Sequence, residues 1–104
     1  MKIFKEEDLK NIPELYSQDG KGDKAVVHIV VNIPGTEYFW LLTEYSEEEQ
    51  LFYGFACLAD TQNAELGYIS KIELEELADN YPLKIEKVEI SLKNAKTKYI
   101  FKED

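Results

Sequence analysis

The chain has 104 residues, a length typical of one domain, and 44% of them are hydrophobic, which is enough to form a core. Its 21 acidic residues face 12 basic ones, all of them lysine, and the formal net charge is −9. That charge repels nucleic-acid phosphates and anionic membranes, so we expect neither direct nucleic-acid binding nor membrane binding.

The first elements in chain order are a short helix and a loop. Leu9 and Ile12 share one face of a predicted helix from Glu6 to Ile12, which Pro13 ends. The segment from Tyr16 to Asp23 contains two glycines among polar residues and predicts a loop that uses positive φ angles.

Three strand-like runs follow this loop. The first, from Ala25 to Ile33, alternates, and its odd-numbered positions predict one wholly apolar face. Those positions are Ala25, Val27, Ile29, Val31 and Ile33. After Pro34 and Gly35, an aromatic and β-branched run covers residues 38–45, and the charged residues 46–50 separate it from a third run at 51–58. The pattern indicates an antiparallel meander.

The last third of the chain predicts a strand, a helix and a tail. Residues 65–69 form a short fourth strand, and Ser70 and Glu73 have the S-x-x-E spacing of a capping box that begins a helix. Pro82 follows the end of this helix. In the tail we expect one or two strands, with Tyr99 to Phe101 as a strand-like triplet.

These elements predict one compact α+β domain over residues 1–104. It contains an antiparallel β-meander of about four to five strands, with two short helices, the N-terminal one and the one after the fourth strand, packed mainly on one face. Aromatic residues occupy both faces of the meander, so the other face needs a second cover. We expect either the C-terminal segment or a partner to supply it.

Four short motifs occur in order along the chain: residues 15–23 (LYSQDGKGD), 43–45 (TEY), 52–54 (FYG) and 65–70 (ELGYIS), before a leucine-rich helix. In this combination the chain resembles small bacterial proteins classified as "domain of unknown function 2958". The resemblance covers residues 9 to about 86, and the lysine-rich stretch from Lys84 to Lys102 departs from it. It implies a compact domain encoded on plasmids, conjugative elements or phages, and it supplies no catalytic residue.

The cysteine count and the N-terminal sequence indicate the cellular compartment and bear on cofactors. Cys57 is the sole cysteine, which excludes an internal disulfide and a zinc cluster, and the N-terminus lacks a signal-peptide pattern. We therefore expect a cytoplasmic protein with no cofactor and no metal site.

Candidate chemical motifs are weak. Cys57 and His28 would form a nucleophile and base pair, but both lie in apolar runs that are typical of core packing. Gly20-Lys21-Gly22 lacks the phosphate-loop pattern, and Asp19 and Asp23 fail the calcium-loop pattern.

The leading functional hypothesis is a protein-binding accessory protein of a mobile element. Residues 25–79 carry eleven acidic side chains and one lysine. Seven acids are the candidate binding surface: Glu44, Glu47, Glu48, Glu49, Asp60, Glu73 and Glu76. In a sharper form the carboxylates imitate DNA phosphates and occupy the basic groove of a host nuclease, restriction or CRISPR complex. The partner in this hypothesis is another protein, and association of the chain with copies of itself as a homo-oligomer is compatible with it.

The alternative is a small-ligand-binding or catalytic domain that uses a polar pocket. Its candidate residues are the polar positions of the four motifs: Tyr16, Gln18, Lys21, Asp23, Glu44, Tyr45, Glu65 and Tyr68.

Overall fold

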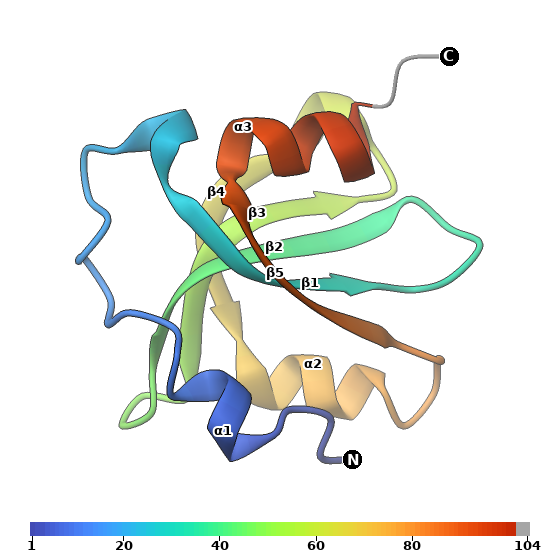
Figure 1. Cartoon of the computed structure of the whole chain (residues 1–104). Helices are drawn as coiled ribbons and strands as arrows, with labels where there is room; N and C mark the ends of the chain where they lie inside the picture. Colours follow the sequence, from blue (N-terminus) through green and yellow to red (C-terminus); the bar gives the residue numbers. More distant parts are fainter. Residues whose placement is uncertain (102–104) are drawn as a thin grey trace.

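Within residues 1–101, the part of the chain that the computed structural model describes, one antiparallel sheet has the strand order β4-β3-β2-β1-β5 (Figure 1). The strands are β1 (Val26–Asn32), β2 (Tyr38–Ser46), β3 (Leu51–Leu58), β4 (Glu65–Ser70) and β5 (Lys84–Ser91). The first four form the meander that the sequence predicts. After β4 the chain crosses one face of the sheet, and β5 pairs antiparallel with β1 at the other edge.

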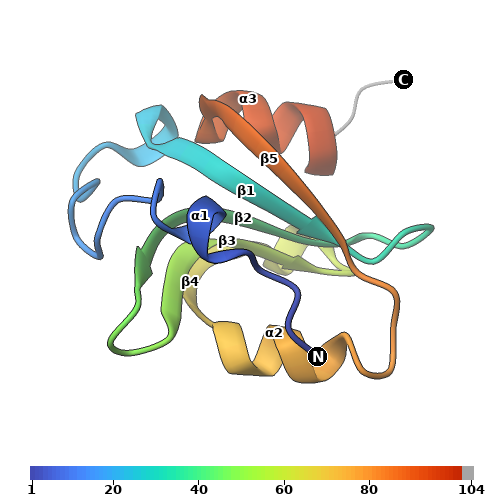
Figure 2. The same cartoon turned by 60° about the horizontal axis from the view of Figure 1, so that its bottom comes forward.

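Short helices cover both faces of the sheet. They are α1 (Glu6–Leu9), α2 (Lys71–Leu77) and α3 (Leu92–Ala95), with turns η1 (Gly22–Lys24), η2 (Thr61–Asn63) and η3 (Lys96–Ile100). Figures 1 and 2 show α1 and α2 on one side and α3 on the other. The sequence prediction that the first two helices share a face is confirmed, and Ser70 caps α2 by accepting the Glu73 N–H at 3.1 Å.

Each face has its own core. The core under α1 and α2 contains Leu9, Trp40, Phe52 and Leu74. The opposite core is built from other side chains of the same strands together with the C-terminal segment: Val27, Val30, Phe39, Leu41, Phe55, Cys57, Leu92 and Ala95. The C-terminal segment therefore supplies the second cover.

The prediction of a strand at Tyr99 to Phe101 is wrong, because residues 96–100 form the helical turn η3. Ser91 accepts the Asn94 N–H at 3.2 Å and begins α3. Leu92 and Ala95, three positions apart, are buried against the sheet, and Tyr99 packs on the same core. This spacing is helical, and the strand-like triplet lies at its end.

The predicted wholly apolar face of β1 is also wrong. Val27 and Val30 pack in the core under α3, whereas Ile29 and Val31 pack under α1 and α2. The pairing of β1 with β5 is irregular between Val27 and Ile29. An irregularity of this kind breaks the strict alternation of side chains, so both faces of β1 are apolar.

A second irregularity lies in β2 and shapes the candidate site. Leu42 pairs with Gly54 and Glu44 pairs with Tyr53, so Thr43 is an extra residue on β2. A Cβ atom on Gly54 would lie 2.0 Å from the Leu41 carbonyl oxygen. Glycine is therefore required opposite this bulge.

Candidate functional site

The bulge of β2 presents Glu44 to the loop that precedes β1. The side chain of Glu44 is only 2% exposed, and its two carboxylate oxygens accept the backbone N–H groups of Tyr16 at 2.8 Å and Gln18 at 2.7 Å. Hydrogen bonds to an ionised acceptor are among the stronger ones in proteins. Glu44 thus holds the loop in place and, contrary to the sequence hypothesis, is not part of an acidic surface.

The buried side chain of Gln18 also holds this loop, through hydrogen bonds to backbone groups. Its amide nitrogen donates to the carbonyl oxygens of Val26 at 3.0 Å and Thr43 at 2.8 Å, and its amide oxygen accepts the Val26 N–H at 2.6 Å. These contacts tie the loop to the start of β1 and to the bulge of β2. The polar groups of Gln18 and Glu44 therefore bind backbone groups, so these two side chains have a structural role in holding the loop.

Tyr16 is held outward by this anchoring. Its φ angle is +73°, a conformation that is costly for a side chain of this size, and 61% of its surface is exposed. The Tyr68 hydroxyl donates to the Tyr16 hydroxyl at 3.1 Å, and this bond, with desolvation, raises the pKa of Tyr68 to about 12. The ring of Tyr53 meets that of Tyr68 edge-on at 5.3 Å.

The structure brings Tyr16, Gln18, Glu44 and Tyr68 together, but it places other predicted pocket residues elsewhere. Tyr45 packs against Phe52 in the core under α1 and α2 and, with Tyr16, lines a groove apart from Gln18 and Glu44. The Asp23 carboxylate faces the Lys96 ammonium at 2.9 Å, and Lys21 and Glu65 are exposed. The eight positions therefore do not line one pocket.

A family model described as "Protein of unknown function (DUF2958)" matches residues 5–100. The chain belongs to this family. The match extends beyond the resemblance seen in the sequence and includes β5, α3 and η3, so the lysine-rich tail is part of the DUF2958 domain. No curated protein and no solved structure matches the chain.

The four motifs by which the sequence resembles the DUF2958 family meet at one corner of the fold. Glu44 of the second motif anchors Tyr16 and Gln18 of the first. Gly54 of the third fits against the bulge of the second, and Tyr68 of the fourth bonds to Tyr16. The motifs occur together because each completes the local structure of another.

Beside this corner an open groove of about 650 Å³ runs between α1 with the segment after it and the turn that joins β2 to β3. Leu9, Ile12, Leu15 and Tyr45 supply its apolar lining. Its charged lining consists of Glu6, Glu14, Glu47, Glu48 and Glu49 with Lys10. Sequence reasoning found the three turn glutamates but missed Glu6 and Glu14, because only the fold brings the N-terminal segment opposite the turn.

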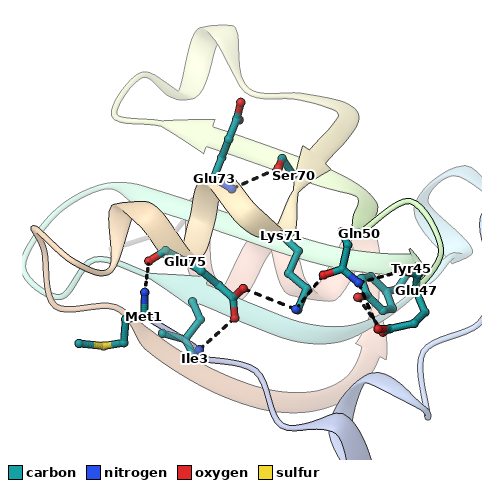
Figure 3. A network of polar contacts seen from close by, with 9 residues as sticks. All are labelled: Met1, Ile3, Tyr45, Glu47, Gln50, Ser70, Lys71, Glu73 and Glu75. Carbon is teal, nitrogen blue, oxygen red and sulfur yellow. Dashed lines mark hydrogen bonds and ion pairs between the residues drawn. The ribbon is translucent and has the colours of Figure 1, made fainter.

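A polar network links the floor of the groove to α2 (Figure 3). Glu47 accepts hydrogen bonds from the Tyr45 hydroxyl at 2.9 Å and the Gln50 amide at 3.1 Å. Burial, followed by the bond to Glu47, raises the pKa of Tyr45. The ammonium group of Lys71 donates to Gln50 at 3.0 Å and lies 3.5 Å from the carboxylate of Glu75. Lys71, the one lysine of residues 25–79, is thereby paired, so Glu48 and Glu49 gain no nearby countercharge from it.

The remaining predicted surface acids are exposed but lie apart from the groove. Asp60 lies just after the C-terminal end of β3, whereas the β2–β3 turn lies before its start. The Asp60 carboxylate accepts hydrogen bonds from the Gln62 backbone and the Asn63 side chain in η2. Glu73 and Glu76 lie on α2, and Glu73 points away from the network in Figure 3. The exposed acids of the candidate surface therefore lie at three separate places: the β2–β3 turn, the residue Asp60 after β3, and α2.

Cys57 and His28 are not arranged as a nucleophile and base. They lie on β3 and β1 with β2 between them, and they are not level along the strands: Cys57 pairs with Phe39, which pairs with Asn32, four residues along β1 from His28. Two strand spacings across the sheet and four residues along it separate them by roughly 16 Å. Burial raises the pKa of the Cys57 thiol and lowers that of His28, so the thiol is not activated. Among the described residues, no group of three or more His, Cys, Asp or Glu side chains is positioned to hold a metal ion.

No helix within residues 1–101 is long and apolar enough to cross a lipid bilayer.

Proposed function

We propose that this protein is a small, cytoplasmic, protein-binding accessory module of a mobile genetic element, and that its groove receives a basic segment of a partner protein. The observation that carries the proposal is the lining of the groove, which places the carboxylates of Glu6, Glu14, Glu47, Glu48 and Glu49 around an apolar floor. Such a surface offers both burial and charge complementarity to an amphipathic segment rich in lysine or arginine.

The net charge of the whole chain supports this choice of partner. At −9 the protein attracts basic surfaces at long range and repels acidic ones, which speeds association with a basic partner at low salt. A counter-defence role is the sharper form of the proposal: the groove carboxylates occupy the DNA-binding surface of a host nuclease or restriction complex. The mobile-element setting rests on the resemblance to the DUF2958 family.

Two charge-reversed variants test the groove. Glu48→Lys with Glu49→Lys alters the groove, whereas Glu73→Lys with Glu76→Lys makes the same change in net charge on α2. Glu47 is left intact because it bonds to Tyr45 and Gln50. The two variants differ only in where the charge is lost.

Binding is measured with short basic peptides and by affinity capture from host lysate, each at low and high salt, with captured proteins identified by mass spectrometry. We expect the groove variant to lose salt-sensitive binding and the α2 variant to retain most of it, because exposed charges farther apart than about 8 Å are largely screened at physiological salt. Equal loss in both variants, or binding that is indifferent to salt, would contradict the proposal.

A further inference from the structure

The tyrosines beside Tyr16 form an exposed aromatic surface that the fold does not need for its core. Tyr16 and Tyr68 are 61% and 54% exposed, and Leu66 next to them on β4 is 41% exposed. A positive φ angle at position 16 costs stability that glycine would avoid, and burial of the ring does not offset that cost. The arrangement is thus suited to contact with another molecule.

A pocket of about 320 Å³ opens next to these rings. Tyr53 and Leu66 supply apolar walls, and the charged groups among its described lining residues are the carboxylates of Asp19 and Glu44. The charge of Asp19 also reaches Tyr68, where it contributes to the raised pKa. An electron-rich ring surface with carboxylates nearby attracts a cation and disfavours an anion.

The protein uses the same chemistry for one of its own cations. The ammonium of Lys96 lies 4.6 Å from the centre of the Phe55 ring and 2.9 Å from the Asp23 carboxylate. Phe55 is two residues from Tyr53 on the same face of β3, and within residues 1–101 no lysine lies over the rings of Tyr53 or Tyr68. The ring and carboxylate at Phe55 have an internal cation, whereas residues 1–101 supply none over the ring of Tyr53.

We propose that Tyr53, Tyr68 and Asp19 form a recognition site for an arginine side chain of the partner. A guanidinium group stacks on aromatic rings and pairs with a carboxylate at the same time, which a lysine ammonium does less well. Tyr16 lines the groove and also bonds to Tyr68, so one basic segment reaches both places. The inference rests on the proposed function, since it names the side chain by which the bound segment is recognised.

The test compares short oligoarginine and oligolysine peptides of equal length, with affinities measured by calorimetry. The variants are Tyr53→Leu, Tyr68→Leu and Asp19→Asn. The matched control is Tyr81→Leu, a tyrosine beyond α2 that is as exposed as Tyr68. We expect the unmodified protein to prefer oligoarginine. Each site variant should weaken oligoarginine about two- to tenfold and oligolysine less, and the control should change neither.

Equal affinities for the two peptides, or site variants that bind oligoarginine as the unmodified protein does, would overturn the inference. If binding is salt-sensitive and is lost in the Glu48→Lys, Glu49→Lys variant but not in the tyrosine variants, the proposed function is supported and the arginine site is refuted. If the unmodified protein binds neither peptide, the proposed function falls with the inference. Ring resonances of Tyr53 and Tyr68, followed by NMR during addition of N-acetylarginine amide, give a readout that does not depend on the folding of any variant.

Discussion

Replacing Glu44 by alanine should be among the most damaging single changes in this protein. The change removes the acceptor of two hydrogen bonds, of 2.8 Å from Tyr16 and 2.7 Å from Gln18, and leaves both N–H groups without that partner. Hydrogen bonds to charged groups contribute about 1.5–3 kcal/mol each, so for two bonds we expect a loss of about 3–6 kcal/mol from the free energy of unfolding. A domain of this size has only about 5–15 kcal/mol in total.

Urea unfolding followed by circular dichroism measures this loss as a shift in midpoint at constant slope. Glu44→Gln separates the two bonds, because the amide keeps one acceptor and turns a donor toward the other N–H, and it should fall between the native protein and Glu44→Ala. Glu48→Ala, an exposed acid in the nearby turn, is the matched control and should change stability by less than about 0.5 kcal/mol. A loss under about 1 kcal/mol in Glu44→Ala would refute the view that this carboxylate anchors the loop.

Four further outcomes are expected. Gly54→Ala should unfold at distinctly lower urea or fail to fold, because its Cβ would lie 2.0 Å from a backbone oxygen, whereas Gly67→Ala, with open space at its Cβ, should cost far less. Tyr16→Gly should change little or raise the unfolding midpoint, since glycine relieves the positive φ angle; a clear loss would show that the ring contacts outweigh the strain. Leu92→Ala should cost about 2–5 kcal/mol in thermal or urea unfolding, because this first side chain of α3 is 1% exposed and packs in the core between α3 and the sheet. The raised pKa of Tyr45 favours the protonated phenol in the folded state, so its contribution is complete below pH about 10 and is lost above it; Tyr45→Phe should flatten the alkaline decline of stability in a pH series.

The sequence predicted the elements whose signals are local. The alternation and turn residues of the first four strands, and the Ser70 cap, depend on neighbours a few positions apart, and the structure confirms them. The tail was harder because its apolar positions mix two periodicities. There, the burial of Leu92 and Ala95 against the sheet decides for a helix, and that burial depends on a distant part of the chain.

The site was predicted less well than the fold. Glu44 looks like one more acid in an acidic stretch, and only the extra residue Thr43 turns it toward the loop. An irregularity of one residue leaves no mark in composition, and its trace in the sequence is the nearby Gly54. Glu6 and Glu14 were missed because their place opposite the β2–β3 turn is set by tertiary packing.

The pairing of β1 with β5 sets the order in which this chain can complete its fold during synthesis. Residues 26–70 can form successive hairpins as they leave the ribosome, but one edge of β1 keeps its amides unpaired until Ile85 and Ile90 arrive to meet Val31 and Val27. During that interval a valine-rich strand is open to pairing with other chains. The nascent protein should therefore need protection from aggregation until residues 84–91 have been made, and a ribosome-stalled product ending before β5 should bind chaperones more strongly than one that includes it.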